Sequence, residues 1–207
     1  MPDKTIPARM ATGQYSLLGP GTIDLSAVIL TAGCDWAMVK ACLVSVVTAC
    51  KKAGRSYEVI VIENYVSEDF HQSVVQDFAD IVLLRFHRKV GFCTSNNAGF
   101  RVSAGRYLLQ LNDDTVVDPS AFKIMMDFME AHPGTGACGP LLLNRDGSVQ
   151  YGISIARPRL IDHVFLMFGI NRMFPNNALV RQYHLMDDPL DVPREILRVI
   201  PPLLVRR

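Results

Sequence analysis

The segment LLQLNDDTVVDP, residues 108–119, has two adjacent carboxylates directly after an apolar run. The run is typical of a buried strand, and Asp113 and Asp114 stand where it ends. Side chains alternate across an extended strand, so neighbouring carboxylates cannot both face one ligand while the strand stays regular. We therefore expect one carboxylate to ligate a metal ion and the other to meet an uncharged polar group such as a sugar hydroxyl.

The cation expected here is Mg²⁺ or Mn²⁺. A cation of this kind that carries a diphosphate usually takes one or two protein carboxylates, and phosphate oxygens and water complete its octahedron. The alternative interpretation is an ordinary polar turn between a strand and a helix, with a spare N-cap residue. The rest of the sequence is needed to distinguish a ligand site from an ordinary turn.

Apolar strands alternate with helices along most of the chain. Strands are expected at 24–31, 57–62, 80–86, 106–111 and 136–143, and helices at 35–54, 67–79, 95–103 and 118–134. Asp35, Ser67 and Asp118 are the expected N-caps. The strands are apolar throughout, as a sheet covered on both faces requires. The pattern predicts an α/β fold with a Rossmann-like, mostly parallel sheet and helices on both faces.

The alternation predicts three regions. Residues 1–22 are expected to be a flexible arm, 23–155 a ligand-binding α/β domain, and 156–207 a Pro-rich segment with short helices. NRDG, residues 144–147, is expected to turn the chain into a hairpin. In an open sheet of this kind, ligands bind beyond the carboxyl ends of the strands, and Asp113 and Asp114 are expected at such an end.

Composition excludes some functions. The formal charge of +1 over 207 residues does not suit a nucleic-acid binder that relies on a basic field. Five scattered cysteines are typical of reduced thiols in a cytoplasmic protein. HVFLMFGI, residues 163–170, is too short to span a bilayer. It leaves open peripheral contact with the inner face of a membrane, or an ordinary core or interface segment.

The most specific pattern is KVGFCTSNNAGFRVSAGRYLLQLNDDTVVDP, residues 89–119. With LSAVILTAG (25–33), YEVIVIENYVSED (57–69) and GPLLLNRDGSVQYG (139–152), it resembles the family 2 inverting glycosyltransferases of GT-A fold, in their rhamnosyltransferase-like branch. The resemblance covers roughly residues 24–152 and includes a DxD-type motif. It implies a nucleotide-diphospho-sugar donor, with UDP- and dTDP-sugars as candidates, and a role in cell-wall or polysaccharide biosynthesis.

The resemblance also implies roles for single residues. The nucleotide-sugar-binding residues would be Thr31, Glu63, Asn64, Gly91, Asn96 and Asp113, and the metal ligand would be Asp114. Thr31 and Glu63 would line the base pocket, and Asp113 would meet the ribose. Gly91 would let the backbone approach the ligand without a side chain in the way.

The sequence departs from the family pattern at several positions. Glu63 replaces the usual Asp, Tyr65-Val66 replaces Gly-Ser, and Lys89 replaces Asn. Pro201-Pro202 stands where small residues normally line the donor sugar. Inverting transfer needs a base for the acceptor hydroxyl, and the Glu-Asp pair that usually supplies it does not follow Asp114.

The general base is therefore unassigned. Asp188, in the tandem acid Asp187-Asp188, is the remaining candidate, and a solvated loop is the favoured interpretation of this segment. We expect a donor-binding half that is truncated or divergent at the acceptor end. The acceptor would be a glycan, a lipid-linked glycan or a small molecule. The alternatives are a non-catalytic nucleotide-sugar-binding module that works with a partner, and a nucleotidyltransferase of related fold.

Overall fold

The computed structural model of the chain describes most of the 207 residues. The described residues are 8–11, 19–33, 35–150, 159–174, 177–183, 186–187, 189, 192–193, 195–196 and 202–207. They form two compact units. The first comprises residues 1–138 and 201–207, and the second comprises residues 139–200.

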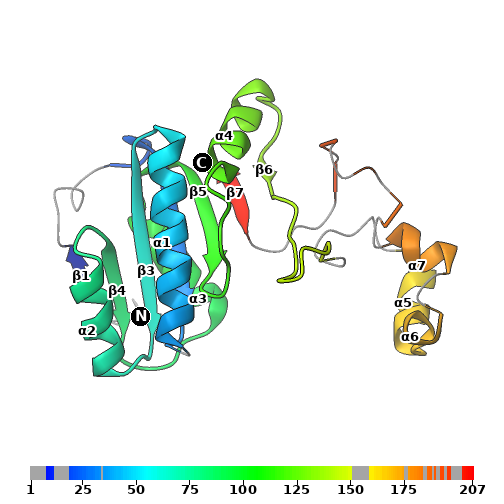
Figure 1. The fold of residues 1–207 in the computed structure, drawn as a ribbon, viewed down its shortest axis with the longest axis horizontal. Helices are drawn as coiled ribbons and strands as arrows, with labels where there is room; N and C mark the ends of the chain where they lie inside the picture. The colour runs from blue at the N-terminus through cyan, green and yellow to red at the C-terminus, as the bar shows by residue number, and fades with distance from the viewer. Residues whose placement is uncertain are drawn as a thin grey trace, which may run out of the picture. The chain divides into compact units, whose positions relative to one another are not determined.

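The first unit is built on one seven-stranded sheet with the strand order β1-β4-β3-β2-β5-β7-β6 (Figure 1). Its strands are β1 (Ala8–Ala11), β2 (Ile23–Thr31), β3 (Tyr57–Asn64), β4 (Val82–Phe86), β5 (Gly105–Asn112), β6 (Ala137–Cys138) and β7 (Leu203–Arg206). Strands β2 to β5 pair in parallel, whereas β1, β6 and β7 join antiparallel. The expected α/β fold with a mostly parallel sheet is confirmed.

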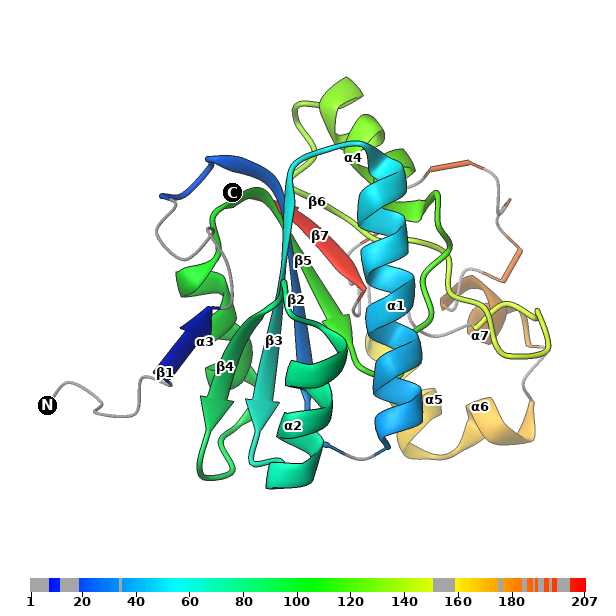
Figure 2. The same cartoon turned by 60° about the vertical axis from the view of Figure 1, so that its left-hand side comes forward.

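Four helices connect these strands and cover both faces of the sheet (Figure 2). They are α1 (Trp36–Ala53), α2 (Glu68–Asp77), α3 (Phe92–Val102) and α4 (Ala121–Ala131). Asp35 caps α1 and Ser67 caps α2, as expected, because each side chain accepts a hydrogen bond from a backbone N–H of the first turn. Gly54 ends α1 in the left-handed conformation with φ 66°.

The core has two layers because the strands are buried on both faces. On one face, α1, α2 and α4 pack on residues such as Ile29, Val61 and Leu109. On the other face, α3 packs on Val28 and Ile62. This arrangement explains why the central strands are apolar throughout rather than alternating.

The C-terminal part of the sheet differs from the prediction. The strand expected at 136–143 is limited to Ala137–Cys138, because Pro140 has no N–H to donate to a neighbouring strand. Its partner is β7, a strand that the Pro-rich pattern did not predict and that also pairs with β5. The helix expected from Asp118 begins at Ala121 instead, after a turn in which Ser120 N donates to Asp118 Oδ1 at 2.7 Å.

Within the segment expected to be an arm, β1 pairs with β4. In the second unit, the expected hairpin is a single antiparallel bridge between Leu143 and Val149. Three short helices follow, α5 (Leu160–Met167), α6 (Ile170–Met173) and α7 (Ala178–Tyr183). Within the part of the chain that the structure describes, none of the helices has the length and apolar character needed to cross a bilayer.

Candidate functional site

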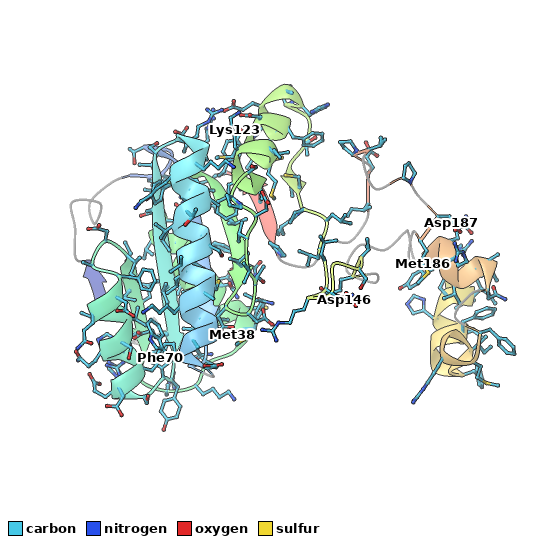
Figure 3. The ribbon with its side chains drawn as sticks, in the orientation of Figure 1. Met38, Phe70, Lys123, Asp146, Met186 and Asp187 are labelled. Atoms are coloured by element: carbon cyan, nitrogen blue, oxygen red, sulfur yellow. The ribbon has the colours of Figure 1, made fainter. Side chains whose placement is uncertain are left out.

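The carboxyl ends of β2, β3 and β5 bring most of the candidate residues to one edge of the sheet. Thr31 at the end of β2 lies opposite Glu63 of β3, and Leu30 lies opposite Asn112 of β5. Adjacent strands are ~4.8 Å apart, so Thr31 lies between Glu63 and the acidic pair that follows Asn112. The first turns of α1 and α2 begin at this edge, where Met38 and Phe70 are labelled in Figure 3.

Asp113 is half-buried beside Thr31. The Thr31 hydroxyl accepts a hydrogen bond from Gly33 N at 3.0 Å and is hydrogen-bonded to the Asp113 carboxylate. Oxygen Oδ2 of Asp113 is buried and has no partner among the described residues. Burial raises the pKa of Asp113, the bond with Thr31 lowers it, and the neighbouring charge of Asp114 raises it again. A half-buried carboxylate with one unpaired oxygen can accept a hydrogen bond from a ligand hydroxyl.

Asp114 is exposed in the turn after β5, and no hydrogen bond or ion pair joins its carboxylate to another described residue. It does not cap a helix either, because α4 begins only at Ala121. The residues between Asp114 and α4 lie along α1. There Val117 N donates to Ser45 Oγ at 3.0 Å, and Lys52 Nζ donates to Ser120 Oγ at 3.0 Å. The Asp114 carboxylate therefore faces solvent and is free to take a ligand.

The donor set at this edge fits a divalent cation that is shared with a ligand. Among the described residues, no group of three or more His, Cys, Asp or Glu side chains could enclose a metal ion by itself. Asp114 and the unpaired oxygen of Asp113 offer one or two carboxylates. That number suits Mg²⁺ or Mn²⁺ when phosphate oxygens and water supply the other ligands.

Glu63 lies inside the protein rather than on the surface of the edge. Its side chain is 0% exposed, and Oε2 is 2.7 Å from Nδ1 of His71 on α2. The Arg85 guanidinium lies 3.8 Å from the same oxygen and also pairs with Glu68 at 2.9 Å. Burial raises the pKa of Glu63, whereas His71 and Arg85 lower it. Oxygen Oε1 is buried without a partner among the described residues.

The pairing of His71 with Glu63 is the feature that sequence reasoning missed. Helical periodicity indicates that Phe70 and Val74 share a face of α2, and it gives no partner for His71. It is a buried residue, 5% exposed. The available signal was an ionisable residue, Glu63, directly after the apolar strand expected at 57–62, because such a group needs a partner nearby when it is buried.

Asn64 connects two loops of the edge. Its Nδ2 donates to Val90 O at 2.9 Å, and its Oδ1 accepts from Val90 N at 2.9 Å. Both polar groups are thus engaged with the backbone next to Gly91. Gly91 itself is exposed at the N-cap of α3, with φ −68° and open space where a Cβ would stand.

Asn96 is buried on α3, 3% exposed. Its Nδ2 donates to Phe92 O at 2.9 Å, while Oδ1 has no partner among the described residues. One helical turn later, Gly99 packs on Val28 and Ile62, which holds Asn96 close to the ends of β2 and β3. Glu63, Asn96 and Asp113 each keep one unpaired buried oxygen, and these three acceptors need N–H or O–H donors.

The candidate base lies elsewhere in the chain. Asp188 falls outside the residues that the structure describes. Its neighbour Asp187, labelled in Figure 3, is exposed and accepts a hydrogen bond from Arg181 Nε at 3.0 Å. This pair belongs to the second unit.

Comparisons with known proteins bear on this site. The model of a family described as "Glycosyl transferase family 2" matches residues 26–187. No curated protein matches the chain. Among solved structures, residues 1–349 of S. aureus TarS share 13% identity over 66% of this chain and 42% of that chain, with a TM-score of 0.50.

Two further structures are similar. TarS in complex with UDP-GlcNAc shares 13% identity over 63% of this chain and 38% of that chain, with a TM-score of 0.51. The mannosyltransferase PcManGT from Pyrobaculum calidifontis, in complex with GDP-Man and Mn²⁺, shares 13% identity over 62% and 39%, with a TM-score of 0.49. The chain spans about two fifths of the length of these proteins.

The family model covers well over half of the 207 residues and includes the whole edge formed by β2, β3 and β5. The two TarS structures share the α/β fold of the first unit, which is the GT-A fold that the sequence resemblance implies. The chain therefore belongs to glycosyl transferase family 2.

Proposed function

We propose that the chain acts in glycosyl transfer, as the part that binds a nucleotide-diphospho-sugar donor and passes its sugar, with inversion, to a hydroxyl acceptor. Membership of glycosyl transferase family 2 supports the reaction class. The observation that carries the proposal is the pair Asp113 and Asp114 at the end of β5, one half-buried beside Thr31 and one free in solvent. The half-buried carboxylate suits a ribose hydroxyl, and the exposed carboxylate suits a metal ion.

In this proposal, Asp113 receives the ribose of the donor. Its unpaired Oδ2 is an acceptor, and a ribose hydroxyl is a donor of matching polarity. Burial raises the pKa of Asp113, and the hydrogen bond from Thr31 opposes this by favouring the ionised carboxylate. The unpaired Oδ1 of Asn96 supports a ligand with further N–H or O–H donors, such as a nucleobase.

Asp114 holds the divalent cation, Mg²⁺ or Mn²⁺, together with the diphosphate of the donor. When bound, the cation offsets the charge that the nucleoside diphosphate gains as the glycosidic bond breaks. Gly91, with open space at its Cα, lets the backbone before α3 approach the phosphates. Asn64 maintains that loop through its two hydrogen bonds to Val90.

The acceptor in this proposal is a glycan or a lipid-linked glycan, and inversion requires a base that takes the proton of its hydroxyl. Asp188 remains the candidate for that base. The prolines at 201 and 202, where the family pattern has small residues, favour a second candidate function. In that alternative, the chain binds nucleotide sugars without turnover and works with a partner chain.

Calorimetry tests donor binding most simply. We expect UDP or dTDP to bind the wild-type chain with Mn²⁺ and to lose most of its affinity without the metal. Asp114→Ala should abolish the metal-dependent part of binding and leave the fold intact. Asp80→Ala is the matched control, because Asp80 is an exposed carboxylate just before the amino end of β4, at the opposite edge of the sheet. Equal affinity in Asp114→Ala and Asp80→Ala would refute the assignment.

Turnover separates the two candidate functions. Release of nucleoside diphosphate from UDP- or dTDP-sugars, with and without a glycan acceptor, can be followed by a coupled assay. Release that depends on Asp114 supports a transferase. Tight binding without any release supports the binding module.

A further inference from the structure

Tyr65 has an unusual backbone conformation at the edge that forms the candidate site. It follows β3 directly and has φ 63°, the positive φ that is otherwise confined to glycines among the described residues. A side chain in this left-handed region brings Cβ too close to the following carbonyl oxygen, and only glycine avoids the cost. The chain thus places an aromatic residue where glycine would be free of strain.

The residues on both sides explain why the backbone adopts this conformation. Asn64 is held to Val90 by two hydrogen bonds of 2.9 Å. Val66 packs under Gly33, where an added Cβ would lie only 3.0 Å from Val66 Cγ1. Tyr65 N donates to Phe86 O at 3.1 Å. Tyr65 thus lies between the loop after β2 and the loop before α3, and its backbone is fixed by both.

Among the described residues, the ring of Tyr65 makes no contact that would offset the strain of its backbone. The side chain of Tyr65 is 64% exposed, and no hydrogen bond or ring contact joins it to another described residue. Tyrosine at a strained, exposed position is typical of a residue that is kept for its side chain. A ligand at the same edge would provide the missing contact.

We propose that Tyr65 stacks on the base of the bound nucleotide; this inference rests on the proposed function. Three observations combine here. Tyr65 follows Glu63 and Asn64 at the carboxyl end of β3, its backbone is pinned between two site loops, and its ring is free. A planar base offers a π-face that an aromatic ring covers well.

Binding to three probes tests the proposal: UDP and dTDP with Mn²⁺, and pyrophosphate with Mn²⁺, which has no base. Tyr65→Gly removes the ring and the strain together, and Tyr65→Asn removes the ring but tolerates the left-handed conformation. We expect both variants to bind nucleoside diphosphate about 5- to 150-fold more weakly, the range that base stacking on an aromatic side chain supplies. Their affinity for pyrophosphate should not change, and Tyr65→Phe should keep wild-type affinity for all probes.

Melting temperature provides the structural control. Tyr65→Gly should melt no lower than the wild type, because glycine relieves the strain at φ 63°. Unchanged UDP and dTDP affinity in Tyr65→Gly and Tyr65→Asn would overturn the stacking role and leave the donor site standing. An equal loss of affinity for pyrophosphate would overturn the stacking role as well, since a changed loop shape would then explain the weaker binding. A wild-type chain that binds none of the probes would overturn the donor site itself.

Discussion

Replacing His71 by Ala removes the main partner of a fully buried carboxylate. Glu63 is 0% exposed, and its Oε2 lies 2.7 Å from His71 Nδ1. Arg85 remains at 3.8 Å from the same oxygen, but it is shared with Glu68. Without His71, Glu63 must either stay charged with a distant partner or take up a proton. Both outcomes cost free energy near neutral pH.

The structure sets limits on that cost. Loss of a hydrogen bond to a charged group costs about 1.5–3 kcal/mol. Protonation sets the upper limit: with an unfolded-state pKa of about 4.3 and 1.36 kcal/mol per pH unit, neutralising Glu63 costs ~3.7 kcal/mol near pH 7. We therefore expect His71→Ala to lower the free energy of unfolding by about 2–4 kcal/mol near pH 7.

The pH dependence follows from the raised pKa of Glu63. A carboxyl whose pKa is higher in the folded state destabilises the fold as pH rises from the unfolded to the folded pKa, and the penalty is absent below the unfolded value. In His71→Ala this pKa rises further. By the same arithmetic, the limit set by protonation falls to about 1 kcal/mol near pH 5.

A second substitution makes the test specific to the pair. Glu63→Gln should destabilise the wild type, because it removes the charge that strengthens the hydrogen bond with His71. In the His71→Ala background, the same substitution should stabilise the protein near pH 7, since it removes an uncompensated charge. Urea unfolding can be followed by the fluorescence of Trp36, the single tryptophan, which packs edge-on against Phe70 at 5.4 Å. The reasoning is refuted if Glu63→Gln destabilises both backgrounds equally.

Three other substitutions test the edge and its support. Burial raises the pKa of Asp113, so acidification should weaken nucleoside diphosphate binding at a higher pH than an ordinary aspartate would cause. In Asp113→Asn, calorimetry should show weaker binding that lacks this contribution to the pH dependence. Gly91→Ala adds a methyl group in open space, so calorimetry should show weaker UDP binding at an unchanged melting temperature. Gly105→Ala would place a Cβ 2.5 Å from the backbone nitrogen of Ser26, and urea unfolding should show a loss of ~3 kcal/mol or more because backbone cannot move aside. Wild-type stability in Gly105→Ala, or wild-type binding in the other two, would contradict the respective argument.

Local signals in the sequence predicted most of the sheet that positions the site. The caps Asp35 and Ser67 and the stop at Gly54 act within one helical turn, so a single sequence reveals them. The apolar strands likewise identify the central parallel pairs. The family resemblance implied Thr31, Glu63 and Asp113 as site residues, and the parallel strands bring them to a common edge.

The features that were missed depend on contacts between distant residues. Strand β7 pairs with β5, almost a hundred positions away, and no periodicity in a short segment after two prolines indicates that partner. The Glu63–His71 pair joins a strand to a helix, and its formation depends on the angle at which α2 leaves the sheet. The strained conformation of Tyr65 results from two loops that hold its neighbours. Each of these requires knowledge of how separate elements pack.

Anomalous diffraction from a crystal of the chain with Mn²⁺ and UDP or dTDP would test the central claim most directly. We predict one manganese peak bound directly to an Asp114 carboxylate oxygen and to the diphosphate, with Asp113 on the ribose. A metal peak away from β5, or a nucleotide bound with Asp114 still free in solvent, would contradict it.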